Sequence, residues 1–453
     1  MTPPAHDAPI TSEDELFEVF QSAFRPRATL VGIEAEKFGI FEDGRPLHYY
    51  DAPDRPGVET LFRALSTRYG WTPSAESEGA PPLMLVRGMA NITLEPGSQF
   101  ELSGSALDNV HAVWAEVDQH REELMRLSEA PGLRWVGLGF APFARPDDLD
   151  WVPKSRYPIM RAYLPTRGTR GLDMMRRTAT VQANFDFTSE RDAMRKLRVA
   201  LAASVISTAL FASSQVVEGK RGPFKSYRAH VWLDTDNDRA GLLPFAWKPD
   251  ATLGDYVRHA LGVPMFIVKR DGVAHQATTH TFERYLREGF NGFRATRSDW
   301  ESHLKTLFPE ARIQKTLEVR GADSVPARLS MALPALWMGI LYDEQTMSFV
   351  EERLVPIGYE AWSAARERVA LEGLKAPVAG TTVGALAREL LTQADAALAR
   401  RNVLDELGAN EQQYLAPMIE ATSRDLSLGD VVLGDWSPSQ PDAIASLLQR
   451  AEY

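Results

Sequence analysis

Short segments with apolar residues at alternating positions, separated by turn residues, occupy much of the first two thirds of the chain. Residues 178–187 alternate in this way, with Val181 and Phe185 on one face and Gln182 on the other. Side chains of a strand point alternately to its two faces, so such segments are predicted to be strands. The predicted strands lie at residues 29–41, 83–102 (two strands around the turn Glu95-Pro96-Gly97), 134–140, 178–187, 265–269 and 314–320.

Other segments have apolar residues at helical spacing. In residues 106–127 the positions Val110, Val113, Val117 and Leu124 fall on one helical face, which predicts a long amphipathic helix. Helices are also predicted at residues 12–24, 60–69, 190–213 and in most segments from about residue 326 onward.

Residues 142–171 contain five prolines and read as an irregular segment, and loops that long in a compact domain are usually functional. The chain has no internal repeat and no obvious linker. We therefore predict a single α+β catalytic domain over residues 1–453, with a mostly helical C-terminal part from about residue 326.

Composition and charge exclude several classes of protein. The chain has 61 acidic and 50 basic residues, a formal charge of -11, which argues against a nucleic-acid-binding protein. An anionic substrate is still possible, because clustered arginines or a bound divalent cation can reverse the local field. The absence of cysteine excludes disulfides, thiolate nucleophiles and cysteine-ligated metals.

The N-terminal residues Met1-Thr2-Pro3-Pro4 do not begin an apolar leader. The most apolar run, residues 199–211, is shorter than the roughly 20 residues that cross a bilayer. We therefore expect a soluble, cytoplasmic protein without a membrane partner.

Candidate chemistry begins with two acids spaced two apart in the first predicted strand. Glu34 and Glu36 share one face of that strand. Two carboxylates on one face repel each other unless a cation lies between them, and Mg²⁺ prefers carboxylate and water oxygens. The alternative for this pair alone is the solvated face of an edge strand.

Three more predicted strands carry polar residues with similar spacing. Each set has an ordinary alternative, such as a water-facing edge or a structural ion pair. Together they are harder to dismiss, because an antiparallel sheet could direct all of them into one cavity. The sets are Glu95, Gln99 and Glu101; Gln182, Asn184 and Asp186; and Glu318 with Arg320.

Familiar nucleotide and catalytic motifs are missing. Glu218-Gly219-Lys220 lacks the leading glycine and the hydroxyl of a phosphate loop, and Gly137-Leu138-Gly139 lacks the third glycine of a dinucleotide fingerprint. Any use of ATP must therefore depend on carboxylates, a metal ion and arginines. The candidate arginines of the middle third are Arg161, Arg176, Arg177, Arg228 and Arg239.

Six segments, in the same order, resemble the plant- and proteobacterial-type glutamate–cysteine ligases. The most specific is the run from Leu94 to Gly104. The others are residues 32–38, 171–175, 178–187, 226–232 and 317–323. This family belongs with the carboxylate–amine ligases related to glutamine synthetase, so the resemblance implies a cup-shaped antiparallel sheet flanked by helices.

The resemblance also implies roles for individual residues. It implies that ATP is a co-substrate and that Mg²⁺ is held by Glu34, Glu36, Glu95, Glu101 and Glu318. Arg320 would meet the transferred phosphoryl group, and Glu36 or Asp186 could accept a proton. Gln99 would lie near the nucleotide, and Arg161, Arg177, Arg228, Gln182 and Asn184 are candidates for binding substrate or phosphate.

The implied reaction joins the γ-carboxyl of glutamate to the amine of cysteine through γ-glutamyl phosphate, the first step of glutathione synthesis. The alternatives are the same chemistry with another amine acceptor, or a non-catalytic module that binds glutamate or a nucleotide. The regulatory cysteines of plant members are absent, so a homodimer, if one forms instead of a monomer, must be noncovalent.

Overall fold

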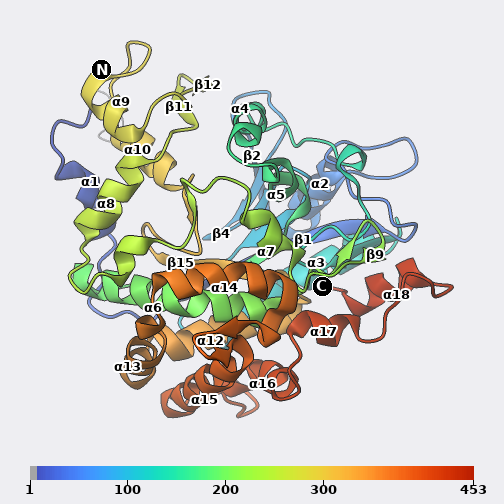
Figure 1. Ribbon diagram of the computed structural model, residues 1–453. Helices are drawn as coiled ribbons and strands as arrows, with labels where there is room; N and C mark the ends of the chain where they lie inside the picture. Colours follow the sequence, from blue (N-terminus) through green and yellow to red (C-terminus); the bar gives the residue numbers. More distant parts are fainter. Residues whose placement is uncertain (1–7) are drawn as a thin grey trace.

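The computed structural model describes residues 8–453, in which nine strands form one antiparallel sheet (Figure 1). The strand β1 (Val31–Phe41) lies in the middle of the sheet, pairing with β7 and β5 in its first half and with β6 in its second half. The path through the other strands is β14 (Ala311–Ile313), β15 (Leu317–Asp323), β7 (Thr180–Phe185), β1, β5 (Phe100–Ser103), β4 (Ala90–Leu94), β3 (Met84–Arg87) and β2 (Thr72–Ser74), and β6 (Leu133–Val136) lies off this path.

One face of the sheet is apolar and is covered by helices. Ile33 and Ala35 of β1 point to this face and are buried. The helices α6 (Glu190–Phe211) and α12 (Ala332–Leu341) pack on it, and α3 (Val110–Ser128) packs against β1 and β6. The hydrophobic effect on this face fixes the register of β1, because a slip by one residue would bury Glu34 and Glu36 among these helices.

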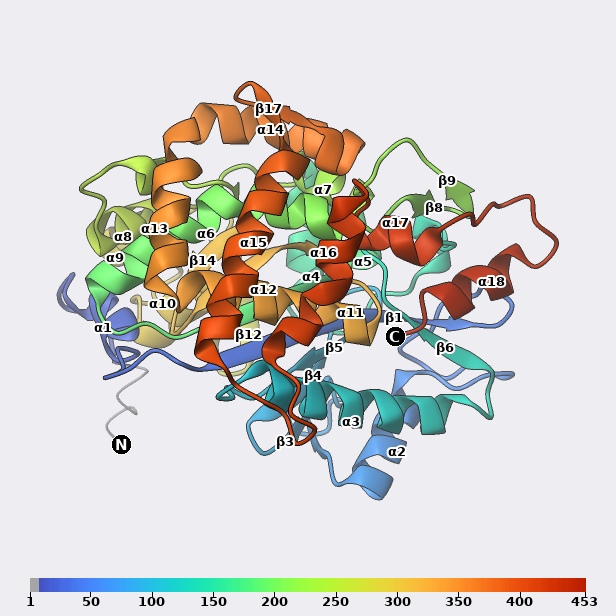
Figure 2. The same ribbon diagram turned by 90° about the horizontal axis from the view of Figure 1, so that it is seen from below.

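The C-terminal third, which includes α12, is mainly helical, and several of its helices pack on α6 (Figure 2). The helices are α11 (Ala327–Ser330), α12, α13 (Glu344–Arg353), α14 (Tyr359–Glu372), α15 (Val383–Arg401), α16 (Ala416–Ser423), α17 (Leu428–Leu433) and α18 (Ala443–Arg450). One hydrophobic core cluster runs from Leu16 to Tyr453, so this part shares its core with the sheet. The division of the chain into domains stays a prediction.

The opposite face of the sheet is polar and lies beneath the short helices α4 (Tyr157–Tyr163), α5 (Gly171–Arg177) and α7 (Tyr227–Trp232) (Figure 1). The prediction of an irregular segment over residues 142–171 was therefore incomplete. Pro158 stands in the first turn of α4, where the missing N–H of proline costs nothing, so it starts this helix instead of breaking it.

Two strand predictions also need correction. Residues 83–102 hold three strands instead of two, because Gly88, with φ +60°, makes a turn between β3 and β4. The strand predicted at 265–269 is β11 (Ile267–Arg270), which pairs only with β12 (Val273–Gln276) outside the main sheet.

The remaining elements surround this framework. They are α1 (Glu15–Gln21), α2 (Val58–Tyr69), α8 (Leu253–Gly262), α9 (Phe282–Glu288), α10 (Arg297–Leu304), and the short strand pairs β8 (Val216–Val217) with β9 (Lys220–Arg221), β10 (Ala240–Gly241) with β13 (Phe308–Pro309), and β16 (Pro377–Val378) with β17 (Thr381–Thr382). Across residues 8–453, none of the helices combines the length and apolar character of a membrane-spanning segment. The first four residues, used to predict the absence of a leader, lie outside this range.

Candidate active site

The predicted acidic residues meet on the polar face of the sheet, and the strand register shows how. Glu36 of β1 lies directly opposite Glu101 of β5. On its other side β1 pairs with β7, where Glu34 stands opposite Gln182. Directly paired residues of antiparallel strands point to the same face, so residues far apart in sequence share one surface.

Three of these carboxylates have short-range partners on the sheet. Glu34 accepts hydrogen bonds from the side-chain amides of Gln182 (3.2 Å) and Asn184 (2.8 Å). Glu101 accepts one from the Thr93 hydroxyl at 2.5 Å. Glu36 accepts one from the backbone N–H of Thr180 at 2.9 Å. These bonds orient the carboxylates without supplying any positive charge.

Glu318 of β15 is the one member of the predicted metal set with close cationic partners. Arg312 of β14 donates two hydrogen bonds to its Oε2, at 2.6 and 3.0 Å, and Arg320 pairs with its Oε1. Burial alone would raise the pKa of Glu318, but the two guanidinium groups outweigh burial and hold that pKa below its ordinary value.

The other acids lack this compensation. Burial raises the pKa of Glu34, Glu36 and Glu95, and repulsion from neighbouring carboxylates raises it further. Glu101 contributes to the repulsion at all three positions, so its carboxylate lies close to each of the other three. A cation placed here would relieve both burial and repulsion.

The donor chemistry fits a divalent cation of the Mg²⁺ type. The site offers carboxylate oxygens together with Gln182 Oε1, which is buried and has no hydrogen-bond partner. Within residues 8–453, however, no three acidic or histidine side chains already stand as a group that could hold a metal ion. Glu318 and Glu101 are turned toward Arg312 and Thr93, so side-chain rotation would have to precede metal binding.

A loop that precedes α4 closes the Glu95 end of this site. Val152 N–H donates to Pro96 O at 3.0 Å, and the Lys154 ammonium (2.6 Å) and the Tyr157 hydroxyl (3.0 Å) both donate to Leu94 O. Glu95 raises the pKa of Lys154, but burial, the largest influence, lowers it to about 8. This loop therefore brings positive charge to the edge of the acidic cluster.

Gln99 holds the turn that carries Glu95. Its side-chain amide donates to Met175 O (3.2 Å) and Thr178 O (2.9 Å), and its Oε1 accepts from Gly97 N–H (2.8 Å). The prediction that Gln99 binds the nucleotide needs correction, because both of its N–H groups are already bonded to backbone. Gly97 has no room for a side chain, since a Cβ there would lie 2.3 Å from Arg176 O.

Among the predicted arginines, Arg228 and Arg320 reach the site. Arg228 is 5% exposed and donates to the backbone oxygens of Gly321 (3.2 Å) and Arg320 (3.0 Å). Arg228 also lies near enough to Glu36 to lower the pKa of that carboxyl. The two guanidinium groups flank the acidic cluster on the β15 side.

Other predicted residues lie elsewhere. Arg177 is buried among Asp173, Glu218 and Ala144 O, so it is a structural residue that joins α5 to residues 142–149, called the 140s loop below. Arg161 is exposed and its guanidinium stacks on Trp151, with the centroid 5.0 Å away. The prediction that Arg177 binds substrate is corrected on this ground, whereas that for Arg161, whose guanidinium is exposed, stays a prediction.

Two further residues considered in the sequence also have structural partners. Asp186 Oδ1 accepts hydrogen bonds from the Tyr342 hydroxyl (2.5 Å) and Leu30 N–H (3.2 Å), and its Oδ2 lies 3.7 Å from Arg25, so its carboxylate is directed at these residues and not at the acidic cluster. Arg239 is fully enclosed in an ion pair with Asp236 at 2.6 Å. Both examples show that polar residues at strand ends serve the packing of neighbouring loops.

Lys154, Arg156 and Arg312 also lie beside the acidic cluster and were not predicted from the sequence. Arg156 lies near Glu95, which raises its pKa, and its guanidinium carbon is 5.3 Å from the Tyr157 ring centroid. The signal available in the sequence was the short basic run Lys154-Ser155-Arg156 in a proline-rich segment. Arg312 stands directly opposite Glu318 on the neighbouring strand β14, a pairing that the predicted strand at residues 314–320 did not include.

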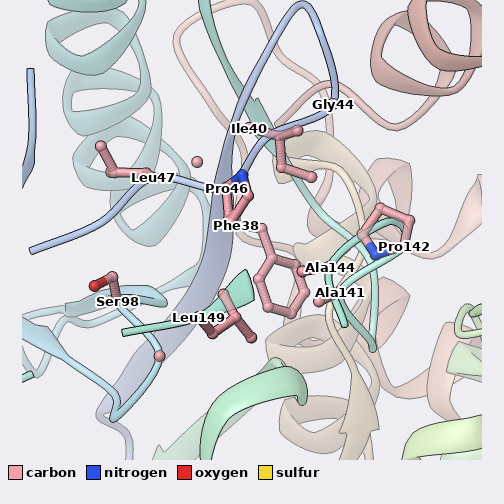
Figure 3. Close-up of a pocket in the computed structure, with 12 residues that line it drawn as sticks. Phe38, Ile40, Gly44, Pro46, Leu47, Ser98, Ala141, Pro142, Ala144 and Leu149 are labelled. Carbon is pink, nitrogen blue, oxygen red and sulfur yellow. The ribbon is translucent and has the colours of Figure 1, made fainter. Parts of the chain in front are cut away.

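A separate cavity lies along β1 beyond the acidic cluster and is shown in Figure 3. Phe38 and Ile40 point into it from β1, and Ala144 and Leu149 close it from the 140s loop. With a volume of about 10 Å³ it has room for no more than a water-sized group. Its lining is apolar, so the chemistry belongs to the acidic cluster and not to this cavity.

The fold is that of a known ligase structure. Glutamate–cysteine ligase from Francisella tularensis, solved in complex with AMP, superposes with a TM-score of 0.54 and 12% sequence identity, covering 94% of this chain and 88% of that chain. At this identity the likeness shows the fold alone, an antiparallel sheet with a helical cover. The fold class is therefore α+β, an antiparallel sheet covered by helices.

The chain belongs to glutamate–cysteine ligase family 2, which residues 30–424 match. The chloroplastic glutamate–cysteine ligase of Brassica juncea is 37% identical over 460 residues, 99% of this chain and 87% of that protein. The chloroplastic enzyme of Arabidopsis thaliana is 36% identical, over 99% of this chain and 85% of that protein. The resemblance seen in the sequence is thereby confirmed, and so is the prediction that the chain is an enzyme.

The prediction of a cytoplasmic protein is wrong by this comparison. The matched plant relatives are named as chloroplastic enzymes. The prediction relied on the lack of an apolar leader, but segments that direct proteins to plastids are amphipathic instead of apolar, so that test could not detect them.

Proposed function

We propose that this chain uses ATP and Mg²⁺ to join the γ-carboxyl of glutamate to the amine of cysteine through γ-glutamyl phosphate, the first step of glutathione biosynthesis. The observation that carries the proposal is the cluster of buried acids around Glu101, with Arg320 and Arg228 at its edge. A module that only binds glutamate would gain nothing from mutually repelling carboxylates.

In the first step an oxygen of the glutamate γ-carboxylate attacks the γ-phosphorus of ATP, and ADP leaves. This step needs charge neutralisation and in-line positioning more than covalent help. Arg320 and Arg228 supply positive charge beside the acidic face. Gln182 and Asn184, which hold Glu34, would contact the substrate or its phosphate.

Mg²⁺, when bound, would neutralise charge on the phosphate oxygens, and the acids that would hold it are Glu34, Glu36, Glu95, Glu101 and Glu318. Gln182 Oε1 offers a further oxygen close to Glu34. Gln99 supports this set indirectly, because it fixes the turn that carries Glu95.

In the second step the cysteine amine attacks the acyl carbon, the bond from that carbon to the phosphate oxygen breaks, and phosphate leaves. The amine loses a proton as it attacks. Glu36 is the acceptor that we propose, through a carboxylate oxygen that does not hold the cation, because it lies on the acidic face directly opposite Glu101.

A phosphate-release assay tests the proposal. The purified protein is incubated with ATP, Mg²⁺, glutamate and a panel of amines, with glutamate or Mg²⁺ omitted as controls. Release with cysteine, and not with the other amines, is the expected result. Release with another amine would keep the chemistry and change the acceptor, whereas no release with any amine would favour a binding module.

A further inference from the structure

Asp323, at the end of β15, lies outside the predicted metal set but is the most heavily bonded acid beside it. Its carboxylate is fully buried and accepts hydrogen bonds from Ser214 Oγ (2.6 Å), Ser226 Oγ (2.8 Å) and Ser213 N–H (2.9 Å). Burying a carboxylate costs free energy that these donors offset, so the loss of one partner would destabilise the local structure.

The two serines link Asp323 to the first turn of α7 by hydrogen bonds. Ser214 Oγ accepts a hydrogen bond from Arg228 N–H at 3.0 Å. Ser226 Oγ accepts one from Ala229 N–H at 2.9 Å and is the N-cap of α7. Through these serines Asp323 therefore fixes the position of the Arg228 backbone, from which the side chain extends.

The Arg228 side chain then returns to the strand that carries Asp323. The register of β15 against β7 shifts between Val319 and Ala322, so a bulge there contains Arg320 and Gly321. Arg228 donates to the backbone oxygens of both bulge residues, and its Nη1 lies 3.9 Å from Asp323 Oδ1. Asp323, Arg228 and the Arg320 bulge thus form one closed unit.

We propose that Asp323 is a positioning residue that holds Arg228 and the bulge carrying Arg320 in the geometry needed for phosphoryl transfer. It acts through Ser214 and Ser226 and touches no reacting atom. The inference depends on the proposed function, because it assigns both arginines to the transferred phosphoryl group and its substrate.

The close packing around Asp323 explains two glycines that match no nucleotide motif. A Cβ on Gly139 would lie 2.4 Å from Asp323 Cγ, and a Cβ on Gly137 would lie 2.3 Å from the Val325 backbone. The chain after β6 can therefore pass over the Asp323 end of β15 only with glycine at these positions. A methyl group on Gly139 would press directly on the Asp323 carboxylate.

The test is a double-mutant cycle of Asp323→Asn and Arg228→Lys in the phosphate-release assay. Each single variant should lower kcat/KM by roughly 10- to 100-fold, the range typical of groups that orient a functional side chain. The kcat/KM of the double variant should be no more than about threefold below that of the less active single variant, because both changes break the same unit.

A matched control separates positioning from simple loss of stability. Glu411 is another fully buried acid, which accepts from Val110 N–H (2.8 Å) and pairs with Arg401 (3.0 Å), at the contact between α3 and the end of α15. Glu411→Gln should lower the melting temperature and leave kcat/KM within about twofold of wild type, since it touches neither arginine.

The proposal would be overturned if the losses of Asp323→Asn and Arg228→Lys multiply, or if Asp323→Asn keeps wild-type kcat/KM. Should Asp323→Asn fail to fold, Ser214→Ala and Gly139→Ala replace it, and wild-type kinetics in both would overturn the proposal equally. A wild-type protein that releases no phosphate would instead contradict the proposed function itself.

Discussion

Glu36 and Glu101 stand directly opposite each other on β1 and β5, on the polar face of the sheet, and each is only 8% exposed. Like charges in a directly opposed pair destabilise a sheet. Among residues 8–453 neither carboxylate forms a short-range ion pair, although Arg228 attracts Glu36 and Lys37 attracts both. This fold therefore holds a repulsion that a bound cation would relieve.

The repulsion predicts that two neutralising variants, which both lose turnover, differ in their effect on stability. Glu101→Gln should reduce turnover by about 10²-fold, as expected when one preorganised electrostatic group is lost, yet should not lower the melting temperature without Mg²⁺. Glu318→Gln should also lose turnover, but it should destabilise the protein, because it leaves Arg312 buried without its partner. Assays of rate and thermal unfolding check both. Turnover within a fewfold of wild type would remove that glutamate from the metal site.

Arg320→Lys should lower kcat more than it weakens ATP binding. Lysine keeps the charge but loses the planar pair of donors that fits phosphoryl oxygens. Steady-state kinetics with ATP varied would measure both constants. A change in the KM for ATP alone would mean that Arg320 binds the ground state and the transition state equally.

The contribution of His303 to stability should fall between pH 7 and pH 5, whereas the raised pKa values of Glu34, Glu36 and Glu95 act in the opposite direction. Burial lowers the pKa of His303 to about 4, while the hydrogen bond to Ala260 O opposes this shift. The unfolded chain, with a histidine pKa near 6.5, binds the proton more readily between these two values, so the contribution of His303 to stability rises with pH across this window and is lost as pH falls. The expected loss from pH 7 to pH 5 is about 2 kcal/mol.

His303→Phe should remove that part of the pH dependence while keeping the ring stack on Phe282. Urea unfolding of both proteins at pH 7 and pH 5 gives the comparison. An equal loss of stability in the two proteins would assign the pH dependence to other groups.

The rate should not respond to dithiothreitol or to mild thiol oxidants, because the chain contains no cysteine. Control of flux would then come from elsewhere, and competition by glutathione at the glutamate site fits the shared γ-glutamyl group. The assay compares oxidised and reduced buffers, with the cysteine substrate protected and glutathione kept low. A rapid, reversible loss of rate on oxidation would contradict this reasoning, since methionine oxidation is slow.

The sheet was largely predictable because its strands alternate between apolar and polar residues. The pairs Glu34 with Glu36 and Gln182 with Asn184 follow directly from that alternation. The third strand in residues 83–102 was missed, because the turn at Gly88-Met89 is short and only one glycine marks it in the sequence.

The arginines were less predictable, because a long side chain on a loop is placed by tertiary contacts. Arg176 and Arg177 are adjacent in sequence to the strand that carries Gln182, yet Arg177 points into the 140s loop. Lys154 reaches the Glu95 end only because Val152 N–H bonds to Pro96 O, a contact between segments far apart in sequence. Sequence spacing within one strand does not contain this information.

The central claim, that glutamate is activated as an acyl phosphate, is tested most directly by oxygen transfer. Glutamate labelled with ¹⁸O in both γ-carboxyl oxygens is incubated with the protein, ATP, Mg²⁺ and cysteine, and the released phosphate is analysed by mass spectrometry. Attack of the carboxylate on the γ-phosphorus leaves one of its oxygens on phosphate, so each phosphate should carry one ¹⁸O atom. Product formation with unlabelled phosphate would contradict the account, because the γ-carboxyl would then never have been bonded to phosphorus.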